Sequence, residues 1–339
     1  MTDAAQKPQG PHQPNAPSID EQVEMFRKMV LVRTMEEELG RLHKAGKTRG
    51  PIHRCDGQEA VGIGATAALL AEDVVTSTHR GHAHYLGKGL DPKGVAAEIM
   101  GRATGLCGGR AGHMLVADKT HGVLGGNAIV GASIPAATGM AVSFQITGAP
   151  SIALAFFGDG AAQTGICHES MNLAALWRLP LVFVCEHNQY GLTVPARQQS
   201  SVPDLAVRAA GYGMEGAIVD GNDALAVYDA VAEAAARARR GDGPTLIEAK
   251  TYRMTGFSTS DVGGYQPAEE MDAWRHRDPI ARLADALAPH VGRDTLDGIA
   301  AAARREMEEA FRSAMDDPVP NAPLQVESPY SNAETSAPQ

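Results

Sequence analysis

The sequence predicts an α/β fold built on a mostly parallel sheet, with helices covering both of its faces. Two short apolar runs, at residues 151–157 and 181–185, have the length and composition of strands buried inside such a sheet. Between them, apolar residues recur near helical spacing until Pro180 stops the pattern. A right-handed strand–helix–strand unit of this length returns the second strand parallel to the first.

The rest of the chain extends this pattern into one domain. Downstream, the sequence predicts a strand at 215–221, a long helix over 223–240, a strand at 244–253 and further helices. Residues 19–316 contain no Pro/Ser-rich linker and no internal repeat, so we expect a single domain there. Residues 1–18 are rich in Pro, Gln and Ala and lack Arg, which is typical of a disordered tail and not of a secretory signal or transit peptide. Residues 317–339 are expected to be equally loose.

Composition indicates a cytoplasmic enzyme that acts on a small molecule. The net charge of −10 argues against nucleic acid or an anionic membrane surface as the main partner. No apolar run approaches the roughly 18 residues that a membrane-spanning helix needs. The four cysteines have no C-x-x-C spacing, so reduced thiols are expected and a zinc site is not.

The most informative pattern lies at the ends of the first two strands, in residues 158–160 and 186–190. Asp159 and Asn188 stand 29 positions apart, at a spacing that brings two strand tips to one sheet edge. The glycines suit a tight turn whose backbone N–H groups approach a phosphate, with residues 160–162 opening the next helix toward that anion. Because a bare carboxylate repels a diphosphate, Asp159 and Asn188 are predicted to bind Mg²⁺ between them.

Simpler interpretations compete with this one. A turn aspartate and a capping asparagine are common without any metal. A dinucleotide fingerprint G-x-G-x-x-G fails because Gln163 occupies its last position. His79, His82 and His84 suggest a metal cluster, but no carboxylate or cysteine lies at suitable spacing along the chain.

Five ordered motifs make the chain resemble the α subunits of the thiamine-diphosphate-dependent 2-oxo acid and acetoin dehydrogenases. The matching segments are HRCDGQEA at 53–60, STHRGH at 77–82, NAIVG at 127–131, the long segment GDG to NQYG at 158–191, and the Tyr-Arg pair at 252–253. The resemblance spans roughly residues 20–320, and segments 77–89 and 103–114 are closer to the acetoin and bacterial pyruvate branches than to the branched-chain branch. It implies a thiamine-diphosphate-binding fold and an oxidoreductase of the pyruvate or acetoin type.

The resemblance also implies a set of site residues. His53 matches the active-site histidine, and Arg80 and Arg253 match arginines that contact the phosphates. The residues implied to bind thiamine diphosphate and its Mg²⁺ are His79, Arg80, Ala128, Val130, Gly158, Asp159, Gly160, Ala161, Asn188, Tyr190 and Arg253. Among them, Asp159, Asn188 and the backbone oxygen of Tyr190 are the implied metal ligands.

Several of these positions depart from the family pattern. Ala128, whose backbone is implied to meet the aminopyrimidine ring together with that of Val130, replaces a usual glycine, and His79 replaces a frequent tyrosine. His187 replaces an asparagine without affecting the implied ligand. Phe257 is the most consequential change, because relatives usually carry a histidine there and phenylalanine neither donates nor accepts a proton.

The resemblance implies partners and leaves three functions open. A β subunit is expected to supply the glutamate that activates the cofactor, in an assembly of two α and two β subunits. With it, the chain is expected to cleave a 2-oxo acid or acetoin and pass the acyl unit to lipoamide on an acyltransferase. Phe257 motivates an alternative, a two-subunit carboligase or lyase without lipoyl transfer. A non-catalytic α-like regulatory partner is the third.

Overall fold

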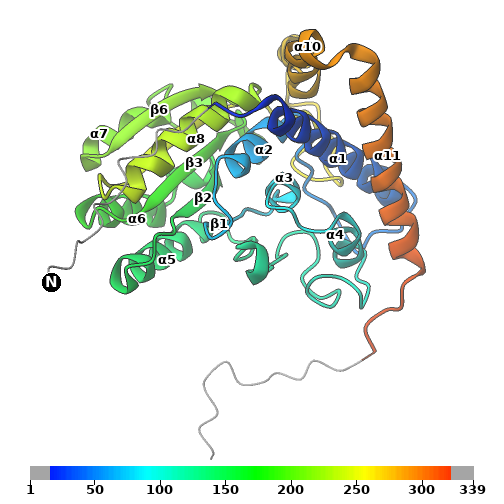
Figure 1. The fold of residues 1–339 in the computed structure, drawn as a ribbon, viewed down its shortest axis with the longest axis horizontal. Helices are drawn as coiled ribbons and strands as arrows, with labels where there is room; N and C mark the ends of the chain where they lie inside the picture. Colours follow the sequence, from blue (N-terminus) through cyan, green and yellow to red (C-terminus); the bar gives the residue numbers. More distant parts are fainter. Residues whose placement is uncertain (1–15, 322–339) are drawn as a thin grey trace, which may run out of the picture.

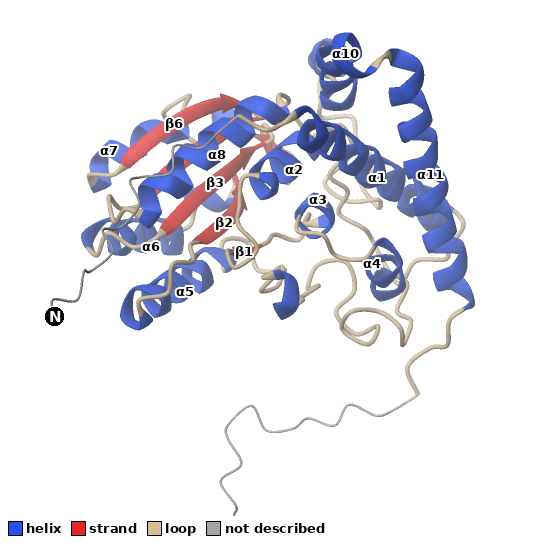
Figure 2. Cartoon of the chain, viewed as in Figure 1, coloured by secondary structure: helices blue, strands red, loops and turns tan. Residues whose placement is uncertain are grey.

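A computed structural model describes residues 16–321 and contains a five-stranded parallel sheet. The strand order is β1-β2-β3-β7-β6, and all four pairings are parallel (Figure 2). The strands are β1 Val74–Thr76, β2 Ala153–Gly158, β3 Leu181–His187, β6 Glu215–Asp220 and β7 Thr245–Lys250. A short antiparallel pair, β4 Tyr190–Gly191 and β5 Val194–Pro195, follows β3. The expected mostly parallel sheet is confirmed.

Helices pack against both faces of this sheet (Figure 1). On one side of the sheet, α8 Ala224–Arg239 packs on the strands, and the other helices of the same hydrophobic cluster pack beyond it; these are α1 Ile19–Lys44, α2 Glu59–Ala67, α3 His82–Gly87, α4 Pro92–Ile99, α10 Pro279–Val291 and α11 Arg293–Asp316. The other side is covered by α5 Ser133–Thr147, α6 Gly165–Leu176 and α7 Ala209–Tyr212. A further helix, α9 Ala268–Arg275, follows the loop after β7.

Alternating side chains in the central strands join these two layers. In β2, Leu154 and Phe156 pack into the cluster that contains α1 and α8, whereas Ala155 and Phe157 pack into the cluster that contains α5 and α6. Successive side chains of a strand point to opposite faces, so a strand covered on both sides must be apolar throughout. This requirement explains why the run at 151–157 reads as continuously hydrophobic.

The segment between β2 and β3 forms the predicted helix, but its start differs from the prediction. Residues 160–162 do not open it; Ala161–Gln163 form one 3-10 turn, and Thr164 is extended with ψ 144°. The Thr164 hydroxyl donates to Ala161 O at 2.7 Å, which closes this turn before α6 begins at Gly165. Two of the apolar residues at helical spacing, Ile166 and Leu176, are 38% and 71% exposed, so they do not face the core.

The tail boundaries remain predictions, since residues 1–15 and 322–339 lie outside the described part of the chain. Ser18 caps α1 in a capping box with Glu21, and the backbone N–H of Ala103 donates to Pro318 O at 2.8 Å. Within residues 16–321, no helix combines the length and apolar character needed to cross a membrane.

The cap of α4 offers a test of local stability. The exposed Asp91 side chain accepts a hydrogen bond from Gly94 N at 2.7 Å, which satisfies one of the free N–H groups at the start of the helix. Asp91→Ala should therefore lower the free energy of unfolding by about 1 kcal/mol. Asp91→Asn keeps a capping oxygen and serves as the control in urea denaturation. Equal losses in both variants would contradict this role of the cap.

Candidate functional site

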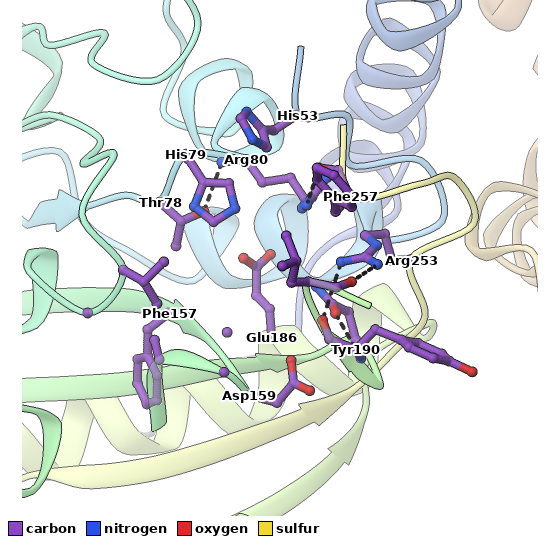
Figure 3. Close-up of a pocket in the computed structure, with 18 of the residues that line it drawn as sticks. His53, Thr78, His79, Arg80, Phe157, Asp159, Glu186, Tyr190, Arg253 and Phe257 are labelled. Carbon is purple, nitrogen blue, oxygen red and sulfur yellow. Dashed lines mark hydrogen bonds between the residues drawn. The ribbon is translucent and has the colours of Figure 1, made fainter. Parts of the chain in front are cut away.

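A cavity of about 500 Å³ lies at the carboxyl ends of β2 and β3 (Figure 3). The fold brings to its wall every residue for which the sequence implied a site role, although they come from segments up to 200 positions apart. These residues are His53, His79, Arg80, Ala128, Val130, Gly158, Asp159, Gly160, Ala161, Asn188, Tyr190 and Arg253. Phe257 lines the same cavity. Their convergence supports one site, while the individual roles remain predictions.

The two strand tips present oxygen atoms that suit a hard cation. Asp159 is 2% exposed, and its Oδ2 has no hydrogen-bond partner among residues 16–321. Burial raises the pKa of this carboxyl, an effect that His187 and Arg253 partly oppose. Asn188 Nδ2 donates to Gln58 Oε1 at 3.0 Å, which leaves Oδ1 as the free end of the amide, with only a long 3.4 Å contact from Tyr190 N. An orphaned carboxylate oxygen beside an amide oxygen fits Mg²⁺.

Two buried arginines give the same cavity a positive charge. Arg80 donates to the backbone oxygens of Arg54 and, at 3.1 Å, Phe257. Arg253 donates to Leu192 O at 2.6 Å and to Tyr190 O at 3.3 Å. In the described part of the chain, neither arginine forms an ion pair with a carboxylate.

Without a bound anion, the charges of the two buried arginines destabilise each other. Burial, together with the charge of Arg253, lowers the pKa of Arg80 to about 10. Two buried cations without a carboxylate partner are unfavourable unless an anion joins them, and their forked donors suit a phosphate. Tyr190 O, implied as a metal ligand, has one of its lone pairs engaged by Arg253.

Three histidine rings gather at one end of the cavity. His53 Nδ1 lies 2.9 Å from His113 Nε2, and the His53 ring meets the edge of the His79 ring at a centroid distance of 4.8 Å. Burial is the main cause that lowers the pKa of His53 to about 4 and the pKa values of His79 and His113 to about 3. The charge of Arg80 lowers the pKa values of His53 and His79 further. All three are therefore neutral at pH 7.

Sequence reasoning missed two members of this site. His113 stands 60 positions from His53, and no spacing rule connects them. Glu186 was noted only as the end of a strand, yet it lines the cavity (Figure 3). Its Oε1 lies 3.2 Å from His84 Nε2. A carboxylate that directly follows a buried strand at a ligand-binding sheet edge was the available signal for Glu186.

Spacing along the chain offered the histidines no carboxylate or cysteine partner, but the fold brings Glu36 and Cys55 to His82. Glu36 Oε1 lies 2.7 Å from His82 Nδ1, and it accepts hydrogen bonds from the backbone N–H and the thiol of Cys55 at 3.0 and 2.9 Å. Burial and the neighbouring carboxylates raise the pKa of the Cys55 thiol, so it stays protonated and remains a donor. The cluster is thus a buried hydrogen-bonded group behind the cavity.

Comparison with known proteins identifies the family. A family model described as the dehydrogenase E1 component matches residues 27–323. The chain belongs to this family. The α subunit of the acetoin:2,6-dichlorophenolindophenol oxidoreductase of Bacillus subtilis is 41% identical over 297 residues, which cover 87% of this chain and 89% of the relative. The pyruvate dehydrogenase E1 component α subunit of Porphyra purpurea is 37% identical over 306 residues, covering 88% and 89%.

Membership in the dehydrogenase E1 family confirms the resemblance inferred from the five motifs. A third relative, the pyruvate dehydrogenase E1 component α subunit of Zymomonas mobilis, is 38% identical over 304 residues, which cover 89% of this chain and 86% of the relative. Relatives from both the acetoin and the pyruvate branches are α subunits, so this E1 chain is of the α-subunit type and a β-subunit partner is implied.

Proposed function

We propose that this chain is the α subunit of a thiamine-diphosphate- and Mg²⁺-dependent dehydrogenase of the pyruvate or acetoin type. One observation carries the proposal. The unpartnered oxygen of Asp159 shares a cavity with Arg80 and Arg253, two buried cations without carboxylate partners in residues 16–321. A diphosphate bridged by Mg²⁺ neutralises all three groups at once.

The residues of this chain then divide the work of holding the cofactor. Asp159 and Asn188 bind the Mg²⁺ with the carbonyl of Tyr190, while the arginines bind the phosphate oxygens. Gly160 and the first residue of the 3-10 turn Ala161–Gln163 also line the cavity, where their backbone N–H groups would be available to a phosphate. When bound, thiamine diphosphate supplies the nucleophile and the electron sink for breaking a C–C bond next to a carbonyl.

A β subunit completes the site in this proposal. The rim of the cavity carries exposed apolar side chains, with Ile129 71% and Leu192 62% exposed and Val130 50% exposed. Apolar side chains clustered at the mouth of a polar cavity favour burial by another chain. We expect that chain to bring the glutamate that activates the cofactor, in an assembly of two α and two β subunits.

Phe257 favours a second candidate function, a carboligase or lyase that does not acylate a lipoyl group. Its backbone is held in place, because Phe257 N donates to Asp261 Oδ2 at 2.8 Å and Phe257 O accepts from Arg80 at 3.1 Å. Its side chain lines the cavity where relatives usually carry a histidine. Proton transfer to or from a lipoyl sulfur therefore lacks its usual group.

Co-expression with the β subunit separates these functions. The assembly is supplied with acetoin, pyruvate or a branched 2-oxo acid, and with either 2,6-dichlorophenolindophenol or a lipoyl domain. Substrate-dependent acylation of the lipoyl domain supports the dehydrogenase, in which an acyltransferase is the further partner. Reduction of the dye without lipoyl acylation favours the second function. Absence of both reactions, together with absence of Mg²⁺-dependent cofactor binding, contradicts both.

Phe257→His provides a direct test of the loop. We expect this variant to raise the rate of lipoyl acylation by about 100-fold, the lower end of the usual contribution of one proton-transferring group. Because the backbone of residue 257 stays anchored, the rate of dye reduction should change little. Mass spectrometry of the lipoyl domain measures the first rate. Phe257→Leu, which supplies no proton, is the control, and a gain of equal size in that variant would refute the explanation.

A further inference from the structure

His113 makes an unusual pair of contacts with His53. The backbone N–H of His53 donates to His113 Nε2 at 3.2 Å, and the Nδ1 atom of the His53 ring lies 2.9 Å from the same nitrogen. The two rings stack with an interplanar angle of 25° and a centroid distance of 5.2 Å. One nitrogen of His113 therefore meets both the main chain and the side chain of a residue that lines the cavity.

These contacts determine which ring nitrogens carry protons. A backbone N–H only donates, so His113 Nε2 presents a lone pair, and the proton of this neutral ring is on Nδ1. Two lone pairs at 2.9 Å would repel each other, so His53 Nδ1 must be the protonated, donating nitrogen. A neutral His53 ring then has its lone pair on Nε2.

We propose that His113 is a positioning residue that fixes His53 as the Nδ1–H tautomer, with Nε2 as a proton acceptor in the cavity. The role of His53 Nε2 in accepting a proton from the substrate rests on the proposed function. The contacts come from a loop between α4 and α5, whose position is supported by a long hydrogen bond from the Tyr85 hydroxyl to His113 O at 3.5 Å. His113 is itself buried, so water does not readily replace it as the acceptor.

The surroundings of His53 keep the acceptor neutral. Arg80 and Arg253 face it from the phosphate end of the cavity, His79 packs edge-on against it, and His82 stands behind His113 at a centroid distance of 6.0 Å. Positive charges on one side disfavour a third charge on the imidazole. His53 thus holds no proton on Nε2 when the substrate arrives.

A neutral acceptor on His53 has a specific use when the substrate is an α-hydroxy ketone. An α-hydroxy ketone carries a hydroxyl that donates to Nε2, whereas an ionised 2-oxo acid has only acceptor oxygens. A bound cofactor would supply the electron sink for breaking the bond between the carbonyl and carbinol carbons, and His53 Nε2 would accept the hydroxyl proton of the part that leaves as an aldehyde. Cleavage of a 2-oxo acid releases carbon dioxide and needs no such acceptor.

Two variants of His113 separate this role from a merely structural one. His113→Gln places an amide oxygen where Nε2 was and preserves the acceptor, whereas His113→Phe preserves the stacked ring and removes it. In the α–β assembly labelled with ¹⁵N-histidine, ring-nitrogen spectra identify the tautomer of His53, whose signals are assigned by their loss in His53→Gln. We expect Nδ1–H in the wild type and in His113→Gln, and a shift toward Nε2–H in His113→Phe.

The loss in kcat should be largest in the variant whose spectra show the changed tautomer of His53. His113→Phe is expected to lower kcat with acetoin on the order of 100-fold, as misorientation of a catalytic group does, and His113→Gln only a few-fold, with cofactor affinity unchanged in both. An Nε2–H tautomer in the wild type, or equal losses in both variants, overturns the proposal. The spectra need no turnover, so an Nδ1–H tautomer in an assembly inactive on every substrate supports the role of His113 while contradicting the proposed function.

Discussion

Asp159→Asn should weaken Mg²⁺-dependent binding of thiamine diphosphate by roughly 100-fold while leaving the fold intact. The substitution keeps the size of the side chain and removes its charge, so the buried orphan oxygen no longer attracts a cation. A charged ligand contributes about 3 kcal/mol, which corresponds to roughly 100-fold in Kd. Since the apo protein pays for burying this carboxylate, its stability without ligand should be unchanged or slightly higher.

Thermal unfolding of the α–β assembly measures both effects together. Added Mg²⁺ and thiamine diphosphate should raise the Tm of the wild type, because a ligand that binds only the native state stabilises it. The Tm of Asp159→Asn should not respond at the same concentrations, and a chelator should remove the response of the wild type. Asp229→Asn, at an exposed position on α8, is the matched control. A wild-type-like response in Asp159→Asn would rule out the metal role.

The sheet and the strand-tip pair could be predicted from the sequence because both depend on local signals. The runs that became β2 and β3 are buried on both faces, so they are almost entirely apolar and short enough to be recognised as strands. Their pairing places Gly158 opposite Glu186, which brings Asp159 and Asn188 to one edge. The motifs added the remaining site residues, all of which line the cavity.

The features that the sequence did not predict depend on single torsions or on distant contacts. The start of α6 depends on the extended ψ of Thr164, and a glycine-rich turn is compatible with either a 3-10 turn or a longer helix. Glu36, Cys55 and His82 meet only because α1, α3 and the loop before α2 pack together. His113 reaches His53 from a loop whose path no periodicity specifies.

Arg80→Gln should weaken cofactor binding nearly as much as the loss of Asp159. Arg80 is buried at the cavity wall, and its two terminal nitrogens each donate one hydrogen bond to a backbone oxygen, of Arg54 and of Phe257, which leaves each of them one further N–H. Glutamine keeps hydrogen-bonding capacity but carries no charge for a phosphate. Losing one charge-assisted bidentate contact costs about 2–3 kcal/mol, or roughly 30- to 150-fold in Kd.

Stability without ligand should distinguish this effect from simple unfolding. In the apo protein, Arg80 has a pKa lowered to about 10, so at neutral pH its buried charge destabilises the native state, and removing it offsets the two hydrogen bonds that are lost. The Tm of apo Arg80→Gln should therefore stay near that of the wild type, and only its increase with thiamine diphosphate and Mg²⁺ should shrink. Arg80→Lys keeps the charge without the forked guanidinium, so its ligand-induced increase in Tm should lie between those of the wild type and Arg80→Gln. If Arg80→Lys bound the cofactor as tightly as the wild type, the charge alone would suffice and the bidentate contact would be refuted.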